Sequence, residues 1–339
     1  MNLGKLGQAL TAREVFDLIQ DELEQVEKMI TVESVASVDT VTAIGQYLQS
    51  SGGKRLRPTL LLISSKLANP NPNGNSSSTS AIQLGAVVEL LHAATLVHDD
   101  VIDAAETRRG RPSSNVKWGN HTCVLAGDWL YMQAFQIALR QRNFQILDLL
   151  IGLTQMMVEG ELLQLDRIGK IDIGEADCME LVDRKTARLF SVCARLGALA
   201  SHSDKHAEER LGEYAWNLGM AFQLVDDVLD FTAREKTLGK PVGGDLREGK
   251  VTLPLVYALE RATPIERRLV ETILRQRNYQ EVPFSRILAL LEKYRGIERV
   301  KERAQSFTDK ARRIINEFPD SPYQRALLAV TELVTERDH

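Results

Sequence analysis

The chain has 339 residues, of which 44% are hydrophobic and 26% charged, a composition that can bury a large core. A net charge of −4, a pI near 6.0 and only 6% aromatic residues argue against a nucleic-acid-binding surface. The three cysteines, Cys123, Cys178 and Cys193, are scattered and show neither disulfide nor zinc-ligand spacing.

The chain starts without a signal-peptide core, and no uninterrupted apolar run is long enough to span a membrane. We therefore expect a soluble, cytoplasmic protein. Helical periodicity then predicts helices over 12–31, with Thr11 as the N-cap, over 39–50, and from Pro58 to Asn69–Pro70. The polar run NPNPNGNSSSTS, residues 69–80, is predicted to be an exposed loop.

Helical patterns fill most of the remaining chain. The predicted helices cover 80–103, 119–140, 144–166, 174–201, 206–233 and several segments of 252–337, with a Gly- and Lys-rich loop over 234–253. Strand-type alternation is absent. The sequence thus predicts an all-α fold, a single helical bundle over 1–339.

One short acidic pattern occurs twice. HDDVID, 98–103, and VDDVLD, 225–230, each place aspartates four residues apart on a helix with an apolar opposite face. Asp99 and Asp103 therefore aim at one point in space, as do Asp226 and Asp230. The like-charged aspartates of such a turn repel each other unless a cation binds between them. Carboxylate oxygens favour Mg²⁺, which commonly shares its coordination with substrate phosphates. A solvated helix end would explain one copy but not two facing copies.

Other polar residues fall near these turns. His92 precedes Asp99 by seven residues and Gln223 precedes Asp226 by three, so each shares the face of its acidic turn. A lone histidine on an apolar helix is usually a core residue, but this alignment favours a ligand role.

Basic residues cluster near glycines and helix starts. GGKRLRP, 52–58, carries Lys54, Arg55 and Arg57 just ahead of a helix, while Arg108 and Arg109 follow the first acidic turn. Lys185 and Thr186 interrupt an apolar helix, and Lys240 and Lys250 flank the 234–253 loop. Magnesium-binding carboxylates beside two cationic groups indicate two diphosphate sites in an apolar cavity.

The motifs GGKRLRP, HDDVIDAAETRRG, KT, FQLVDDVLD and GK…GGDLREGK, in this order, resemble trans-isoprenyl diphosphate synthases. The long-chain octaprenyl and solanesyl diphosphate synthases look most similar. The resemblance implies an α-bundle homodimer with a central hydrophobic cavity. It also implies a prenyltransferase of isoprenoid and quinone biosynthesis that condenses isopentenyl diphosphate with an allylic diphosphate, farnesyl or geranylgeranyl, on three Mg²⁺ ions.

The resemblance also implies roles for individual residues. The magnesium ligands are Asp99, Asp103 and Asp226, with Asp100, Asp227 and Asp230 as indirect or water-mediated contributors. The isopentenyl diphosphate site takes Lys54, Arg57, His92 and Arg109. The allylic diphosphate site takes Arg108, Lys185, Thr186, Gln223, Lys240 and Lys250. The catalytic residues are Asp99, Asp103, Asp226, Lys185, Thr186 and Gln223. Gln164 stands where some members carry an aspartate.

The residues below the first acidic turn bear on product length. Ala94 and Thr95 are small, where members making short products carry a bulky aromatic residue, and Leu91 and Leu90 lie beyond them. We therefore expect an open tunnel and a C40–C45 product, solanesyl ahead of octaprenyl.

Several alternatives stay open at this point. One is a medium-chain, geranylgeranyl-type synthase, and another is a catalytically idle regulatory subunit, although such subunits usually lose aspartates from one motif. A class I terpene cyclase shares the acidic motif but does not need GGKRLRP or Arg109 for a second diphosphate.

Overall fold

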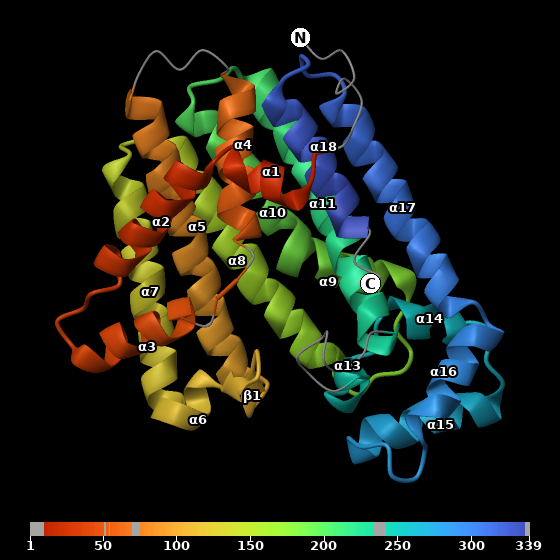
Figure 1. The fold of residues 1–339 in the computed structure, drawn as a ribbon. Helices are drawn as coiled ribbons and strands as arrows, with labels where there is room; N and C mark the ends of the chain where they lie inside the picture. Colours follow the sequence, from red (N-terminus) through yellow and green to blue (C-terminus); the bar gives the residue numbers. More distant parts are fainter. Residues whose placement is uncertain (1–9, 51, 54, 70–74, 233–241, 336–339) are drawn as a thin grey trace. The chain divides into compact units, whose positions relative to one another are not determined.

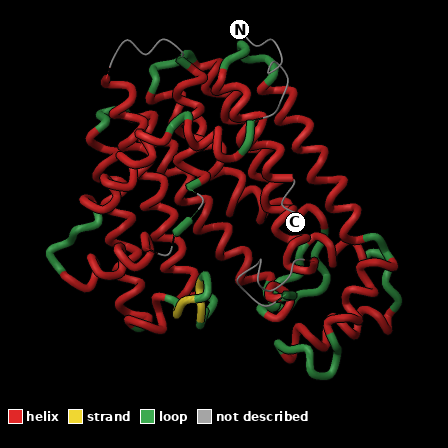
Figure 2. Tube along the Cα trace, viewed as in Figure 1, coloured by secondary structure: helices red, strands yellow, loops and turns green. Residues whose placement is uncertain are grey.

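The computed structural model describes residues 10–50, 52–53, 55–69, 75–232 and 242–335. The described chain is helical apart from its connections and one small hairpin, so the predicted all-α class is confirmed (Figure 2). It divides into two compact units, each made of segments that are separated in the sequence. The prediction of a single domain stays a prediction.

Unit 1 comprises residues 1–151, 190–215 and 311–333. Its core is built around α5, which contacts α7, α4 and α2, and these helices lie side by side in Figure 1. Its first elements are α1 (Ala12–Asp17), α2 (Gln20–Glu33), α3 (Asp39–Ser50), α4 (Leu56–Ala68) and α5 (Asn75–Ile102). Then follow β1 (Thr107–Arg108), β2 (Arg111–Pro112), α6 (Ser114–Trp118), α7 (Asn120–Arg140) and the start of α8 (Phe144–Arg167). It also includes most of α10 (Arg188–Ala200), the start of α11 (Lys205–Thr232), the end of α17 (Gly296–Ile315) and most of α18 (Pro322–Thr335).

Helix α5 is the most apolar long element of unit 1. Its residues Leu84, Val87, Val88 and Val97 are fully buried, so the helix is covered on more than one side. The stretch Ser78–Ile102 is long and apolar enough to cross a membrane, but 67% of its most apolar window is buried inside the protein. Burial against other helices explains that hydrophobicity as it does for a core helix.

Unit 2 comprises residues 152–189, 216–310 and 334–339. Within it α14 packs on α9 and α16, while α15 packs on α13 and α16. Its elements are the rest of α8, α9 (Glu175–Val182), the π-helical turn η1 (Asp183–Ala187), the rest of α11, α13 (Gly244–Arg247), α14 (Leu253–Leu259), α15 (Pro264–Gln276), α16 (Phe284–Lys293) and most of α17.

Several predicted boundaries are correct and several are wrong. Thr11 caps α1 through a capping box with Glu14, as predicted, but the helix expected over 12–31 breaks at Leu18–Ile19. The 69–80 segment is a loop only in part, because α5 begins at Asn75. The helix expected over 174–201 contains the π turn, and α13 lies within the expected 234–253 loop.

Candidate active site

The first acidic turn lies at the C-terminal end of α5 in unit 1. Asp99 is half-buried and Asp103 is exposed, and their spacing of one helical turn puts both on one face. Burial and the nearby charges of Asp99 and Asp128 raise the pKa of Tyr131 on α7 to about 12. The turn therefore offers two accessible carboxylates to a cation.

Asp100 behaves differently from its neighbours. Its side chain is fully buried and accepts a hydrogen bond from Arg108 Nε at 2.6 Å. Its other oxygen accepts from the backbone N–H of Ser114 at 3.2 Å and from the Ser114 hydroxyl at 2.9 Å. The carboxylate that was expected to assist the metal indirectly is thus turned into the protein.

A basic cluster forms in unit 1 from three segments. His92 of α5 is close to four arginines, and burial followed by the charges of Arg57, Arg109, Arg108 and Arg55 holds its pKa well below 6.5. His92 is therefore neutral at neutral pH and can both donate and accept one hydrogen bond. The structure brings together the described members of the predicted isopentenyl diphosphate site; Lys54 lies outside the described residues.

Sequence reasoning placed Arg55 in the basic GGKRLRP cluster without assigning it to a substrate site, and it did not single out Glu89. Arg55 precedes α4 with a left-handed φ of 46° and forms ion pairs with Glu27 and Glu89. Glu89 is 7% exposed and accepts from Arg55 Nη1 at 2.9 Å, while its Oε1 has no hydrogen-bond partner among the described residues. The available signal was spacing, because Glu89 lies one turn before His92.

The second cationic group lies in unit 2, on the π turn η1. Lys185 Nζ forms an ion pair with Glu161 at 2.5 Å and donates to Gln164 Oε1 at 2.9 Å. Gln164 thus holds a lysine in the described structure. An extra residue in a helical turn is frequent at functional sites, because it redirects side chains out of the regular helical rows.

Thr186 and Gln223 are connected in a short chain of hydrogen bonds. The Thr186 hydroxyl donates to Gln223 Oε1 at 2.8 Å, and Gln223 Nε2 donates to Asp227 Oδ1 at 3.0 Å. The structure therefore joins two predicted allylic-site residues to the second acidic turn.

That second turn lies on α11 in unit 2. Asp226 is half-buried, whereas burial and the charges of Asp245, Asp226 and Asp230 raise the pKa of buried Asp227 well above its ordinary value. Asp245, whose backbone N–H donates to Asp230 Oδ2 at 3.2 Å, is an acidic neighbour that sequence reasoning did not single out. The sequence feature that could have indicated Asp245 is its position in the motif GGDLREGK.

The two remaining predicted lysines are placed differently. Lys250 forms an ion pair with Glu248 at 2.7 Å, and Lys240 lies outside the described residues. Of the residues predicted to set product length, Ala94, Leu90 and Leu91 are almost completely buried. Thr95 is half-buried and donates to the carbonyl of His92.

The donor chemistry of both turns fits Mg²⁺. Each turn presents carboxylate oxygens, and no group of three or more metal-binding side chains is found in the part of the chain that the structure describes. Mg²⁺ commonly takes only one or two protein carboxylates and completes its shell with water and phosphate oxygens. Asp99 and Asp103 belong to unit 1 and Asp226 to unit 2. That they act together stays a prediction.

Comparison with known proteins gives consistent matches. The Polyprenyl synthetase family matches residues 38–291. The octaprenyl diphosphate synthase of Escherichia coli (strain K12) is 33% identical over 338 residues, which cover 100% of both chains. The all-trans-nonaprenyl-diphosphate synthase (geranyl-diphosphate specific) of Rhodobacter capsulatus is 33% identical over 302 residues, 89% of this chain and 90% of that one.

A solved structure is similar over nearly the whole chain. The polyprenyl synthase of Caulobacter crescentus CB15, complexed with calcium and isoprenyl diphosphate, superposes with a TM-score of 0.90 at 32% identity. The match covers 98% of this chain and 100% of that one.

Proposed function

The chain belongs to the polyprenyl synthetase family, and from this premise we propose that it is a magnesium-dependent, long-chain member. It is a trans-polyprenyl diphosphate synthase, a prenyltransferase that joins isopentenyl diphosphate to an allylic diphosphate. The observation that carries the proposal is the pairing, in each unit, of an acidic turn with a cationic group. A carboxylate–metal–diphosphate assembly needs both parts.

Divalent cations bound to Asp99, Asp103 and Asp226 would neutralise the diphosphate charge that grows as the allylic C–O bond breaks. The calcium in the Caulobacter enzyme supports a divalent-cation site of this kind. The proposed number of three Mg²⁺ ions rests on the family resemblance.

The protein's own residues would bind and orient the two substrates. Arg57, Arg109 and neutral His92 would hold the diphosphate of isopentenyl diphosphate, with Lys54 beside them. Lys185, fixed by Glu161 and Gln164, would bind the allylic diphosphate, together with Arg108, Lys240 and Lys250. Such positioning lowers the entropic part of the barrier.

The polar chain near the second acidic turn would stabilise the developing allylic cation. The Thr186 and Gln223 dipoles are held in place by their hydrogen bonds, so they need no reorganisation as charge develops. The double bond of isopentenyl diphosphate then attacks the allylic cation and forms the new C–C bond. The isopentenyl unit loses one proton, which the released diphosphate accepts.

The experiment that tests this function uses the intact chain, Mg²⁺, labelled isopentenyl diphosphate and either farnesyl or geranylgeranyl diphosphate. We expect labelled products that, after dephosphorylation, have the length of C40–C45 alcohols. A geranylgeranyl-length product would favour the medium-chain alternative. A folded protein that performs no condensation would favour an idle subunit of a heteromeric synthase.

Product length is proposed to depend on the small residues before Asp99. Replacing Ala94 by phenylalanine should block the tail, so the product should shorten by several isoprene units on chromatography. Since Ala94 is fully buried, overpacking should also cost about 1–3 kcal/mol of stability, and circular dichroism must show a folded variant. Ala176→Phe, at an exposed site on α9, is the control and should leave product length unchanged. A folded Ala94→Phe enzyme with wild-type products would contradict the tunnel.

We also propose that the enzyme is a cytoplasmic homodimer. Three exposed apolar residues of α7, Leu125, Met132 and Leu139, follow one another at intervals of seven. Phe144, Ile151, Val158 and Leu165 of α8 repeat the same spacing. A seven-residue apolar repeat favours helix packing against another helix, and exposed apolar residues in such a row are typical of an interaction site. A second copy is the partner that the family resemblance suggests.

A further inference from the structure

The first acidic motif has three aspartates, and the middle one, Asp100, differs from the other two in its burial. Asp103 is exposed and Asp99 half-buried, whereas Asp100 is completely buried and all its described donors belong to Arg108 and Ser114. A buried carboxylate must be satisfied by donors or a countercharge, because leaving it unpaired would be costly. Arg108 and Ser114 supply both.

The partners of Asp100 lie on or directly after a very small hairpin. Strands β1 and β2 pair Thr107 with Pro112 and Arg108 with Arg111, so the turn consists of Arg109 and Gly110. Both turn residues have positive φ, 52° and 73°, as the type I′ turn of a two-residue hairpin requires. An isolated two-stranded hairpin has little stability of its own, so its anchors decide where Arg109 lies.

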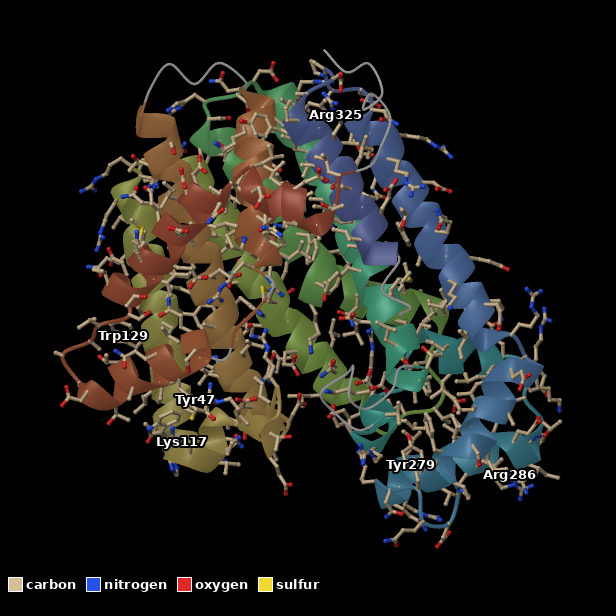
Figure 3. All side chains as sticks on the ribbon, in the orientation of Figure 1. Tyr47, Lys117, Trp129, Tyr279, Arg286 and Arg325 are labelled. Carbon is tan, nitrogen blue, oxygen red and sulfur yellow. The ribbon has the colours of Figure 1, made fainter. Side chains whose placement is uncertain are left out.

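A second set of contacts ties this hairpin to α3. The Tyr47 hydroxyl donates to the carbonyl of Pro112 at 2.7 Å, and Arg111 Nη1 donates to Ser50 Oγ at 3.1 Å. Arg111 and Lys117 both lie 4.2 Å from the Tyr47 ring centroid, and Figure 3 shows Tyr47 and Lys117 beside each other. These contacts are at the surface, whereas the Asp100 contacts are buried.

Arg109 reaches the other basic segment from this hairpin. A Cβ atom built on Gly53 would lie 3.3 Å from Arg109 Nη1, so the guanidinium rests directly against the GGKRLRP segment. Arg109 also contributes to the field that keeps His92 neutral. The place of the hairpin therefore decides whether the cationic cluster of unit 1 is complete.

We propose that Asp100 is a positioning residue that acts through Arg108 and Ser114, and that it does not bind metal. Arg108 neutralises the negative charge of Asp100 inside the protein, and Asp100 in turn fixes the hairpin that presents Arg109 to isopentenyl diphosphate. This inference rests on the proposed function and adds a division of labour within the acidic motif: two aspartates for the cation and one for the arginines.

The test compares Asp100→Asn with Asp99→Asn in steady-state assays. Losing a charge-assisted hydrogen bond should raise the KM for isopentenyl diphosphate by about tenfold in Asp100→Asn. The Mg²⁺ concentration for half-maximal rate should stay at the wild-type value in this variant and rise in Asp99→Asn. In an Arg108→Gln background, Asp100→Asn should add little, since both substitutions break the same contact.

Hydrogen exchange provides a readout that needs no activity. The Ser114 amide, which donates to Asp100, should exchange faster in Asp100→Asn than in the wild-type protein, while amides of α7 keep their protection. Ser114→Ala, which removes one donor and keeps the carboxylate, serves as the milder variant if Asp100→Asn does not fold and should also raise the KM.

The opposite results would overturn the inference. An Mg²⁺ requirement that rises in Asp100→Asn as in Asp99→Asn would make Asp100 a metal ligand. Unchanged Ser114 exchange, or a penalty of Asp100→Asn that adds fully to that of Arg108→Gln, would remove the positioning role. A wild-type protein without any condensation activity would refute the proposed function, and the exchange experiment would still decide how the hairpin is held.

Discussion

At the scale of single residues, His92 shows how a cationic surrounding determines a protonation state. Burial and four arginines lower its pKa below 6.5, so folding at acidic pH must expel a proton that the unfolded chain would hold. The unfolded state then binds more protons than the folded state, and stability falls as the pH decreases through the ordinary histidine pKa. Above that range the contribution is constant.

A substitution can isolate this effect. His92→Gln cannot be protonated, so its free energy of unfolding should decline less between about pH 7.5 and pH 5.5 than that of the wild type, by up to about 1.4 kcal/mol per pH unit. Urea unfolding at both pH values measures the difference. The control is His121→Gln, at an exposed position of α7. Equal slopes for wild type and His92→Gln would show that His92 takes up its proton in the folded protein.

At the scale of elements, the π turn η1 and helix α8 fit closely around a glycine. A Cβ atom on Gly160 would lie 2.9 Å from Arg184 Cβ and 3.2 Å from Lys185 Cγ. The turn itself is held by Asp183, which accepts hydrogen bonds from Trp216 at 2.5 Å and Arg188 at 2.9 Å. The position of Lys185 therefore depends on the absence of a side chain at Gly160 in α8.

Alanine substitutions in α8 test this dependence. Gly160→Ala should displace the π turn, destabilise the protein by about 1–3 kcal/mol and raise the KM for the allylic diphosphate. The matched control is Gly152→Ala in the same helix, where a Cβ meets nothing within 4 Å. This control should be neutral or stabilising by up to about 1 kcal/mol, as expected for alanine in a helix. Equal stability and kinetics of the two variants would contradict the role of Gly160.

The elements also show what the sequence could and could not predict. The ends of α3, α7 and α8 were predicted well, because apolar periodicity and flanking Gly, Ser or Asn residues mark them. The break between α1 and α2 was missed, because Val15 before it and Ile19 within it are both buried and continue the helical pattern. The π turn was missed, since one extra residue leaves hydrophobicity almost unchanged.

At the scale of the whole molecule, the seven-residue apolar repeats of α7 and α8 should control assembly. Met132→Asp places a charge among exposed apolar residues, so a homodimer should become monomeric in light scattering while circular dichroism stays unchanged. Ile265→Asp, at a 71% exposed residue of α15, is the matched control and should leave the mass unchanged. A wild-type protein of monomer mass would refute the proposed dimer.

The candidate site was predictable in composition but not in its internal contacts. Motif order indicated Asp99, Arg57, Lys185 and Gln223 because metal and diphosphate binding demand these residue types. The partners that hold them, such as Glu161 for Lys185 and Ser114 for Asp100, come from other helices or turns. Only tertiary packing brings such partners together, so no local sequence pattern predicts them.

The hydrogen bond from Thr186 to Gln223 determines whether the threonine hydroxyl can donate to a ligand or only accept from it. The Thr186 hydroxyl donates its only proton to the amide oxygen of Gln223, and the Gln223 amide donates one N–H to Asp227. In this arrangement the threonine oxygen can offer a ligand only its lone pairs. It can stabilise an electron-poor carbon in this arrangement, whereas donating to a phosphate oxygen would require the hydrogen bond to Gln223 to break.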